Sequence, residues 1–269
     1  MIIWLASYPK SGNTWVRIFL NLLLFSKENQ LDFNKLEQIP QFPQKYYFEG
    51  LTENFGDMRE FVKNCIDAQS RCNLENKTHI FKTHNAFWKS GEYSFTDEEN
   101  SLGVIYIVRD PRSLVTSLKN HYFLKNDQDS INFMSNEKKI IKNAVLSSWN
   151  NHFNSWKKFK KNYLLIKYEN LLKNPGLEFR RITNFLKNTC GVAINESKID
   201  TSIKLSEFSN LKKKEENQGF IEAPKTKDGK AINFFNLGPK NDWKKLIKNE
   251  TAKEIEKIFE KEMVELGYI

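Results

Sequence analysis

Apolar and β-branched residues gather in four short runs that are separated by longer, more polar stretches. The runs cover residues 2–7, 78–83, 104–108 and 163–168. Near-continuous apolarity is typical of strands buried on both faces, and each of the last three runs follows a segment long enough for a crossover. The pattern predicts a mostly parallel sheet covered by helices, which is an α/β fold of three layers.

Helical periodicity fills much of the remaining chain. We expect helices over residues 13–25, 111–122, 136–159 and 175–188, and a further helix at the C-terminus. In that last segment apolar residues recur at helical spacing, a pattern that indicates core packing more often than function. They are Ile255, Ile258, Phe259, Met263 and Leu266.

Residues 212–242 show neither a strand period nor a helix period. The segment holds three glycines, two prolines and many lysines. A long loop of this kind in a compact domain is usually an active-site lid or a binding loop, and plain disorder is the alternative. We expect a loop that serves the functional site.

Composition narrows the class of protein. The 269 residues show no shift that would mark a linker, so we expect one domain over residues 1–269. A hydrophobic fraction of 39% excludes a wholly disordered chain, and a net charge of +9 favours an anionic ligand. The lysines are scattered and do not form one block, so a solvated surface is the alternative explanation of the charge, and we expect no nucleic-acid partner.

Cysteine usage and the apolar run over residues 15–25 bear on the compartment. Cys65, Cys72 and Cys190 are odd in number and lack C-x-x-C spacing, which disfavours a disulfide framework and a zinc site. The apolar run is too short to span a bilayer, and the start of the chain lacks the features of a signal peptide. We expect a cytoplasmic protein with neither a metal nor a membrane partner.

The stretch SYPKSGNTW, residues 7–15, joins the first expected strand to the first expected helix. At such a junction the free N–H groups and the helix dipole favour an anion. Gly12 permits close approach, while Lys10, Ser11 and Thr14 add a cation and two hydroxyls suited to phosphate or sulfate oxygens. The order G-x-x-x-x-G-K-[ST] is absent, which disfavours ATP. A simple strand-to-helix turn is the alternative.

The octamer YPKSGNTW resembles the 5′-phosphosulfate loop of the PAPS-dependent cytosolic-type sulfotransferases, whose pattern is YPKSGTTW. Asn13 replaces a threonine and suits a position at or near the helix N-cap. The resemblance implies a P-loop-like sulfotransferase fold with PAPS as the co-substrate. It also implies that this cofactor is bound by Lys10, Ser11, Gly12, Asn13, Thr14 and Trp15.

Residues 106–122, YIVRDPRSLVTSLKNHY, place Arg109 at a strand end and Ser117 in the following helix, which Asp110 is suited to cap. The segment is similar to the family's 3′-phosphate segment, in which an arginine and a serine eight residues later bind the 3′-phosphate. Arg109 and Ser117 keep that spacing. The alternatives are an ion pair of Arg109 with Asp110 or another acid, and a merely tolerated polar residue at position 117.

The segment IFKTHNAF, residues 80–87, resembles the family's lysine and catalytic histidine, which places Lys82 and His84 in these roles. Sulfuryl transfer needs a base for the acceptor's proton and cations for oxygens that gain charge. An imidazole that titrates near pH 6.5 suits the first task. The alternative for His84 is a satisfied polar residue at a strand end. We expect His121 and His152 to be structural or surface residues.

Three further segments extend the resemblance. Tyr168 holds a position that lies near the nucleotide in the family, and Phe208 either stacks on the base or packs in the core. In the late motif R-K-G-x-x-G-D-W, Gly238 remains, but Asn236 and Leu237 replace the basic pair. Either the cofactor is bound less tightly or nearby lysines supply the charge. The candidates are Lys225, Lys227, Lys230 and Lys240.

These segments together predict transfer of a sulfuryl group from PAPS to a hydroxyl or amine of a small-molecule acceptor. By the resemblance, Lys10 neutralises the leaving 5′-phosphate, Lys82 and the loop N–H groups stabilise the transferring group, and His84 takes the acceptor's proton, with no metal. The alternatives are a phosphate-loop kinase and a non-catalytic protein that binds anions or nucleic acid.

No motif encodes the acceptor or the oligomeric state. The aromatic-rich residues 42–50 and 85–88 either line an apolar pocket with the 212–242 loop or belong to the core. The opening WLASYPKSGNTW resembles that of bacterial relatives that tailor specialised metabolites or saccharides. The family's dimerisation motif has no match in residues 244–253, which leaves the oligomeric state open.

Overall fold

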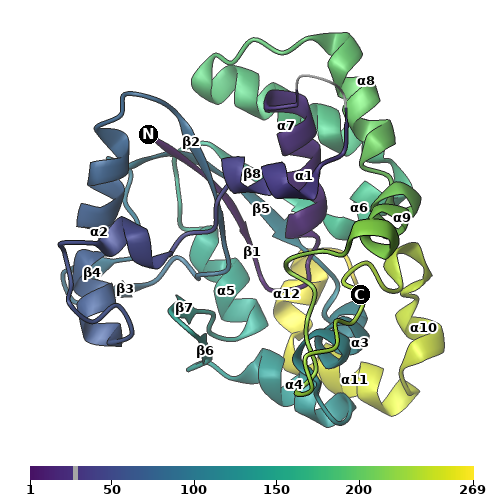
Figure 1. The fold of residues 1–269 in the computed structure, drawn as a ribbon. Coiled ribbons are helices and arrows are strands. Elements are labelled where there is room, and N and C mark those ends of the chain that lie inside the picture. Colours follow the sequence, from purple (N-terminus) through teal and green to yellow (C-terminus); the bar gives the residue numbers. More distant parts are fainter. Residues whose placement is uncertain (27–29) are drawn as a thin grey trace.

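The computed structural model describes residues 1–26 and 30–269, which are built around a four-stranded parallel sheet (Figure 1). The strands are β1 (Ile2–Ser7), β2 (His79–Thr83), β5 (Ser101–Val108) and β8 (Tyr163–Lys167), in the spatial order β2-β1-β5-β8. All three strand pairs are parallel. The four apolar runs are therefore confirmed as strands, and the fold is α/β.

The two central strands, β1 and β5, lie deep in the core. Every side chain of β1 and nearly every side chain of β5 is buried, whereas most positions of the edge strand β8 are only partly buried. Successive side chains point to opposite faces, so Ile3 and Leu5 enter one hydrophobic core while Trp4 and Ala6 enter the other. Two cores on opposite faces of one sheet produce the three layers predicted from the sequence.

Helices cover both faces of the sheet (Figure 1). One face packs against α1 (Asn13–Leu24), α7 (Pro175–Cys190) and α8 (Glu196–Leu205). The other packs against α2 (Met58–Asn73), α3 (Pro111–Tyr122), α5 (Trp149–Trp156), α11 (Asn249–Ile258) and α12 (Glu260–Glu265). The helices predicted over residues 13–25, 111–122 and 175–188 are confirmed.

Shorter elements connect these layers. The helices among them are α4 (Asp127–Ser135), α6 (Tyr168–Lys173), α9 (Phe208–Gln218), α10 (Trp243–Leu246) and the 3₁₀ segments η1 (Phe33–Gln38), η2 (Lys45–Phe48) and η3 (Gly238–Lys240). Two small hairpins pair β3 (Lys89–Ser90) with β4 (Tyr93–Ser94), and β6 (Ile140–Ile141) with β7 (Ala144–Val145). Within residues 1–26 and 30–269, no helix is both long and apolar enough to traverse a bilayer.

The helix predicted over residues 136–159 is wrong in its first half, where β6 and β7 form a hairpin and α5 begins only at residue 149. Ser147 has a φ of 59°, in the left-handed region that interrupts a right-handed helix. The hairpin also bonds to the segment after β2. Val145 N–H donates to Asn85 Oδ1 at 2.9 Å, and its carbonyl accepts from Ala86 N at 2.8 Å. Long-range pairing therefore overrides the local helical pattern.

Two other predictions need correction. The loop predicted over residues 212–242 begins only after α9, so its first residues are helical. This polar helix packs against the rest of the protein through its two buried residues, Leu211 and Glu215. Glu215 accepts hydrogen bonds from Phe234 N at 2.7 Å and Phe235 N at 2.8 Å, a long-range contact that no period reveals. At the C-terminus two helices replace one, and Ile258, predicted to be core, is 40% exposed.

Candidate active site

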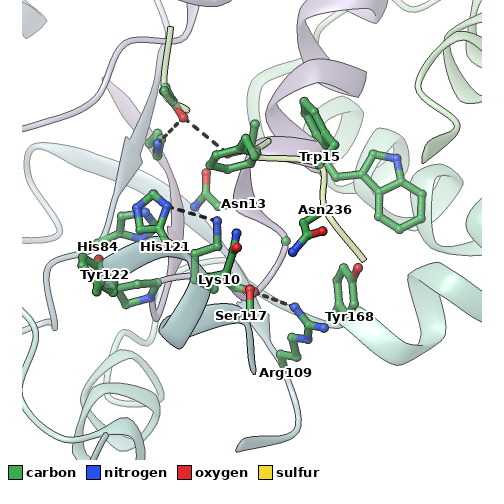
Figure 2. A pocket seen from close by; sticks show the side chains of 18 of the residues that line it. Lys10, Asn13, Trp15, His84, Arg109, Ser117, His121, Tyr122, Tyr168 and Asn236 are labelled. Carbon is green, nitrogen blue, oxygen red and sulfur yellow. Dashed lines mark hydrogen bonds and ion pairs between the residues drawn. The ribbon is translucent and has the colours of Figure 1, made fainter. Parts of the chain in front are cut away.

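A cavity of about 510 Å³ lies at the carboxyl ends of the sheet strands, where open α/β sheets bind ligands (Figure 2). The segments that follow all four strands reach its wall. The structure brings nearly all of the sequence-predicted site residues to this wall. They are Lys10, Gly12, Asn13, Thr14, Trp15, Lys82, His84, Arg109, Ser117, Tyr168, Phe208 and Gly238. Among the predicted residues, Ser11 alone lies behind the wall, fully buried.

The loop between β1 and α1 needs a glycine at its end. Gly12 is the N-cap of α1 and has a φ of 103°, and a Cβ placed there would lie 2.6 Å from Cδ2 of the Tyr168 ring. Both the backbone conformation and the close approach exclude a larger residue. The first N–H groups of an α-helix have no partner within the helix, so the start of α1 offers donors to an anion in the cavity.

Asn13 does not cap the helix. It is the first residue of α1, and its Nδ2 donates to the Leu5 carbonyl at 2.9 Å and to Ser7 Oγ at 3.2 Å. The side chain therefore turns back to β1 and acts as a donor, whereas an N-cap side chain accepts. It fastens the start of the helix to the strand and so fixes the turn between them.

Lys10 is a half-buried cation that contacts a histidine and an aromatic ring. Its Nζ lies 3.5 Å from His121 Nδ1 and 3.8 Å from the centre of the Phe234 ring. Burial, followed by the charges of Arg109 and Lys82, lowers the pKa of Lys10 to about 7. Burial and then Lys10 lower the pKa of His121 to about 3, so this imidazole is neutral and its Nδ1 accepts from the lysine. An anion in the cavity would restore the charge balance at Lys10.

Sequence reasoning set His121 aside as a structural or surface residue, but the structure places it on the cavity wall beside Lys10 (Figure 2). Its position late in α3 carries no motif. One sequence feature could have pointed to His121 as a site residue. It follows Ser117 by four residues, and this spacing places both side chains on one face of the helix.

Arg109 forms no ion pair with Asp110, so that alternative is wrong. Asp110 caps α3 by accepting from Arg112 N and also binds the Arg112 guanidinium, with Nη2 to Oδ2 at 2.7 Å. Arg109 Nη1 instead donates to the Lys10 carbonyl at 3.0 Å, and its guanidinium lies 4.2 Å from the centre of the Tyr168 ring. Among the described residues this cation has no carboxylate partner, and both Arg109 and Ser117 of α3 line the cavity.

His84 lies at the end of β2 with a defined tautomer. Its Nδ1 is 2.8 Å from the Ser7 carbonyl, which can only accept, so Nδ1 carries the hydrogen and Nε2 keeps its lone pair. Burial, followed by the Lys82 charge, lowers the pKa of His84 to about 3. The side chain is therefore a neutral imidazole on the cavity wall and can accept a proton at Nε2.

His152 is hydrogen-bonded to the backbone of His84 and so helps to fix its position. It is fully buried, its Nε2 lies 3.1 Å from the His84 carbonyl, and its Nδ1 lies 2.8 Å from the Tyr106 hydroxyl. Nε2 donates to the carbonyl and Nδ1 accepts from the tyrosine. The expectation that His152 is structural agrees with this position, because it connects β5 to the backbone of His84.

Lys82 forms an ion pair that the sequence did not reveal. Its Nζ donates to Glu222 Oε2 at 3.0 Å, and Arg17 Nη1 contacts the other carboxylate oxygen. Burial alone would raise the pKa of Glu222, but the Lys82 and Arg17 charges outweigh it and hold that pKa at about 2. Thr14 Oγ1 also lies 3.4 Å from Oε2. Glu222 belongs to the 212–242 segment, and this part of it therefore lines the site, as expected of a binding loop.

The late motif reaches the cavity through different residues from those expected to supply charge. Asn236, Leu237 and Gly238 line the wall, and a Cβ at Gly238 would lie 2.3 Å from the Phe208 ring. Phe208 thus packs under this turn and still borders the cavity. The four lysines proposed as replacements are exposed and are not part of the wall. They are Lys225, Lys227, Lys230 and Lys240.

The other half of the cavity is largely apolar. Pro43, Phe55, Ile141 and Leu146 contribute to it, together with polar residues of the β6–β7 turn. Of the aromatic-rich segment at 42–50, Pro43 lines the cavity, whereas its phenylalanines are buried in the core. Residues 85–88 likewise do not reach the wall.

Unpaired polar atoms identify the half that fits an anion. Trp15 Nε1 and Arg109 Nε, on two side chains of the wall, are buried and have no hydrogen-bond partner among the described residues, and the same holds for Ser11 Oγ behind the wall. Buried donors without partners are rare and costly, so each calls for an acceptor supplied by a ligand or water. All three belong to the predicted cofactor segments. The residues present therefore fit a nucleotide that carries phosphate or sulfate groups.

Comparison with known proteins gives a family match over almost the whole chain. The family profile described as "Sulfotransferase domain" matches residues 2–267. A 3-beta-hydroxysteroid sulfotransferase from Cavia porcellus is 26% identical over 97% of this chain and 83% of its own length. An amine sulfotransferase from Oryctolagus cuniculus is 21% identical over 97% of this chain and 80% of its own length.

Solved structures share the fold. A mouse sulfotransferase complexed with PAP superposes with a TM-score of 0.60 at 20% identity, covering 97% of this chain and 83% of that one. Retinol dehydratase in complex with androsterone and inactive cofactor PAP gives a TM-score of 0.61 at 20% identity, covering 97% of this chain and 80% of that one. The predicted sulfotransferase-type α/β fold is confirmed.

Proposed function

The chain belongs to the sulfotransferase domain family, and on this premise we propose that it transfers a sulfuryl group from PAPS to a hydroxyl or amine of a small molecule, releasing adenosine 3′,5′-bisphosphate. One observation carries the proposal. Lys10 and Arg109, which have no carboxylate partner among the described residues, border the same cavity as the neutral base His84.

The donor half of the cavity is the part with phosphate-binding chemistry. We assign the 5′-phosphosulfate to Lys10 and the N–H groups that begin α1, and the 3′-phosphate to Arg109 and Ser117. Tyr168 and Phe208 border the same half, where aromatic rings suit a nucleobase. Two solved relatives of the same fold are complexed with PAP, which supports this assignment.

PAPS supplies a sulfuryl group whose bond to the 5′-phosphate breaks as the acceptor attacks. His84 Nε2 takes the acceptor's proton, since Nδ1 is occupied by its bond to Ser7. Lys10 neutralises the 5′-phosphate as it gains charge. Lys82 and the N–H groups of the loop stabilise the oxygens of the transferring group.

The acceptor binds in the apolar half, beside His84. Relatives named for hydroxysteroids and amines support a small molecule with a hydroxyl or amino group. The resemblance of residues 4–15, WLASYPKSGNTW, to bacterial tailoring enzymes favours a specialised metabolite or a saccharide as the acceptor. Free cysteines at 65, 72 and 190 fit a reducing cytoplasm.

The proposal is tested by incubating the protein with PAPS and a panel of phenols, alcohols, amines and saccharides while measuring release of adenosine 3′,5′-bisphosphate. Acceptor-dependent release that survives a metal chelator supports it. ATP turnover abolished by the chelator would indicate a kinase, and salt-dependent oligonucleotide binding without PAPS turnover would indicate a binding protein.

A further inference from the structure

Glu222 lies on the segment of residues 219–237, which we call the strap because it joins α9 to η3 along the cavity. Its neighbour Ile221 is 84% exposed, whereas the Glu222 carboxylate turns inward to Lys82 and Arg17. A negative side chain in a cavity that fits an anion opposes the charge of the ligand. Its presence there requires a compensating role.

Lys82 depends on this carboxylate more than Arg17 does. Lys82 is 5% exposed, and the described hydrogen bond of its Nζ is the one to Glu222. Arg17 also donates to the carbonyls of Ile39 at 2.6 Å and Leu36 at 2.9 Å, so it would keep two partners if Glu222 were removed. A buried ammonium without a partner is driven to release its proton and to change position.

We propose that Glu222 is a positioning residue whose carboxylate aims the Lys82 ammonium at the transferring sulfuryl group and fastens the strap to β2. The inference rests on the proposed sulfuryl transfer. One carboxylate faces two cations, Lys82 and Arg17, so the cluster keeps a net positive charge for the oxygens of the transferring group.

The alternative role for the Glu222 carboxylate is inhibitory: it would occupy the position of a donor oxygen and compete with the ligand. Thr14 Oγ1 and Lys82 Nζ both point at Glu222 Oε2, at 3.4 Å and 3.0 Å, and both are predicted to contact the donor. If the carboxylate merely held the place of a donor oxygen, its removal would increase affinity and activity. A positioning role predicts a loss of activity, so the sign of the effect separates the two.

The first test measures the titration of the Lys82 side chain in the ligand-free protein. In protein labelled with [13C]lysine, NMR measures the chemical shift of Lys82 Cε as a function of pH. The Lys82 signal is assigned as the one that is missing from the spectrum of Lys82→Gln. The charged and titratable groups facing Lys82 are Arg17 of α1, Lys10 of the loop, His84, His121 of α3 and Glu222. In Glu222→Gln the midpoint of the Lys82 titration moves to lower pH, because the one negative charge in this set is lost.

The second test measures turnover of PAPS with a verified acceptor across pH. Lys82 acts as a cation, so activity falls as pH rises through its pKa, and in Glu222→Gln this fall begins at lower pH. At alkaline pH we expect a loss of kcat relative to wild type, because a smaller fraction of Lys82 carries its charge, with KM for PAPS little altered. Glu222→Asp restores the charge and recovers most of the activity.

Glu216→Gln is the matched control, because Glu216 is an exposed residue of α9 and loses the same charge away from the cavity. It should leave both the Lys82 titration and the pH profile unchanged, and circular dichroism checks that each variant is folded. An unmoved Lys82 midpoint in Glu222→Gln, or a higher kcat with tighter bisphosphate binding, overturns the inference. If the wild type does not turn over PAPS while the Lys82 midpoint still moves, the proposed function fails and the contact between Glu222 and Lys82 stands.

Discussion

Replacing His84 by asparagine separates proton transfer from binding. The asparagine amide can donate to the Ser7 carbonyl in place of imidazole Nδ1, which now lies 2.8 Å from that oxygen, so the end of β2 should keep its shape. The variant lacks a basic nitrogen where Nε2 borders the cavity. A positioned base contributes roughly 10²-fold to 10⁴-fold, so the barrier should rise by about 3–5 kcal/mol.

The assay compares kcat for PAPS turnover with the affinity for adenosine 3′,5′-bisphosphate measured by calorimetry. We expect kcat to fall by roughly 10²-fold to 10⁴-fold while the bisphosphate binds with near wild-type affinity, because the ligands proposed for it lie on the loop and at Arg109. His79→Asn, at the other end of the same strand and outside the cavity wall, is the control.

The pH profile of the wild type should also differ from the one expected for an unperturbed histidine. From the sequence, activity would rise with pH near 6.5, but burial and the Lys82 charge hold the pKa of His84 at about 3. The imidazole is neutral above that value, so kcat with an alcohol acceptor should show no histidine-dependent rise between about pH 5 and 8. Wild-type turnover in His84→Asn with a verified acceptor would refute the assignment of the base.

Three further predictions follow from the donor half of the cavity. Arg109→Ala should abolish the preference for adenosine 3′,5′-bisphosphate over 5′-AMP, whereas Lys10→Ala should weaken both ligands and keep the preference; calorimetry that finds an unchanged preference in Arg109→Ala contradicts the assignment. Gly12→Ala should destabilise the fold by about 1–3 kcal/mol and abolish bisphosphate binding, because its Cβ meets a tyrosine ring at 2.6 Å; an unchanged melting temperature contradicts it. From the sequence, joint replacement of three strap lysines by glutamine should weaken bisphosphate binding. The structure places these lysines away from the cavity wall, so we expect the affinity for the bisphosphate to change by less than about 3-fold at physiological salt. They are Lys225, Lys227 and Lys230.

Contacts within a few residues of one another are the part of this protein that the sequence predicts well. The apolar runs at 2–7 and 104–108 predicted two of the strands because burial on both faces leaves a local pattern, and the structure places both in the middle of the sheet. The loop from Lys10 to Thr14 was predictable for a similar reason, since the strand, the glycine and the helix start are consecutive. The family resemblance assigned Lys82, His84 and Arg109 to the same site as that loop, and the structure brings them to one cavity because the carboxyl ends of parallel strands meet at one edge of a sheet.

The sequence by itself therefore determined the parallel sheet, the anion-binding turn and the residues at the strand ends. Tertiary structure alone decided that His121 meets Lys10 across 111 residues and that Glu222 meets Lys82 across 140. It also turned residues 140–145 into a hairpin against the segment after β2. The reason is physical: strands, turns and caps leave periodic or local signals, whereas the partner of a polar side chain depends on how distant segments pack, and its sequence neighbours carry no trace of that packing.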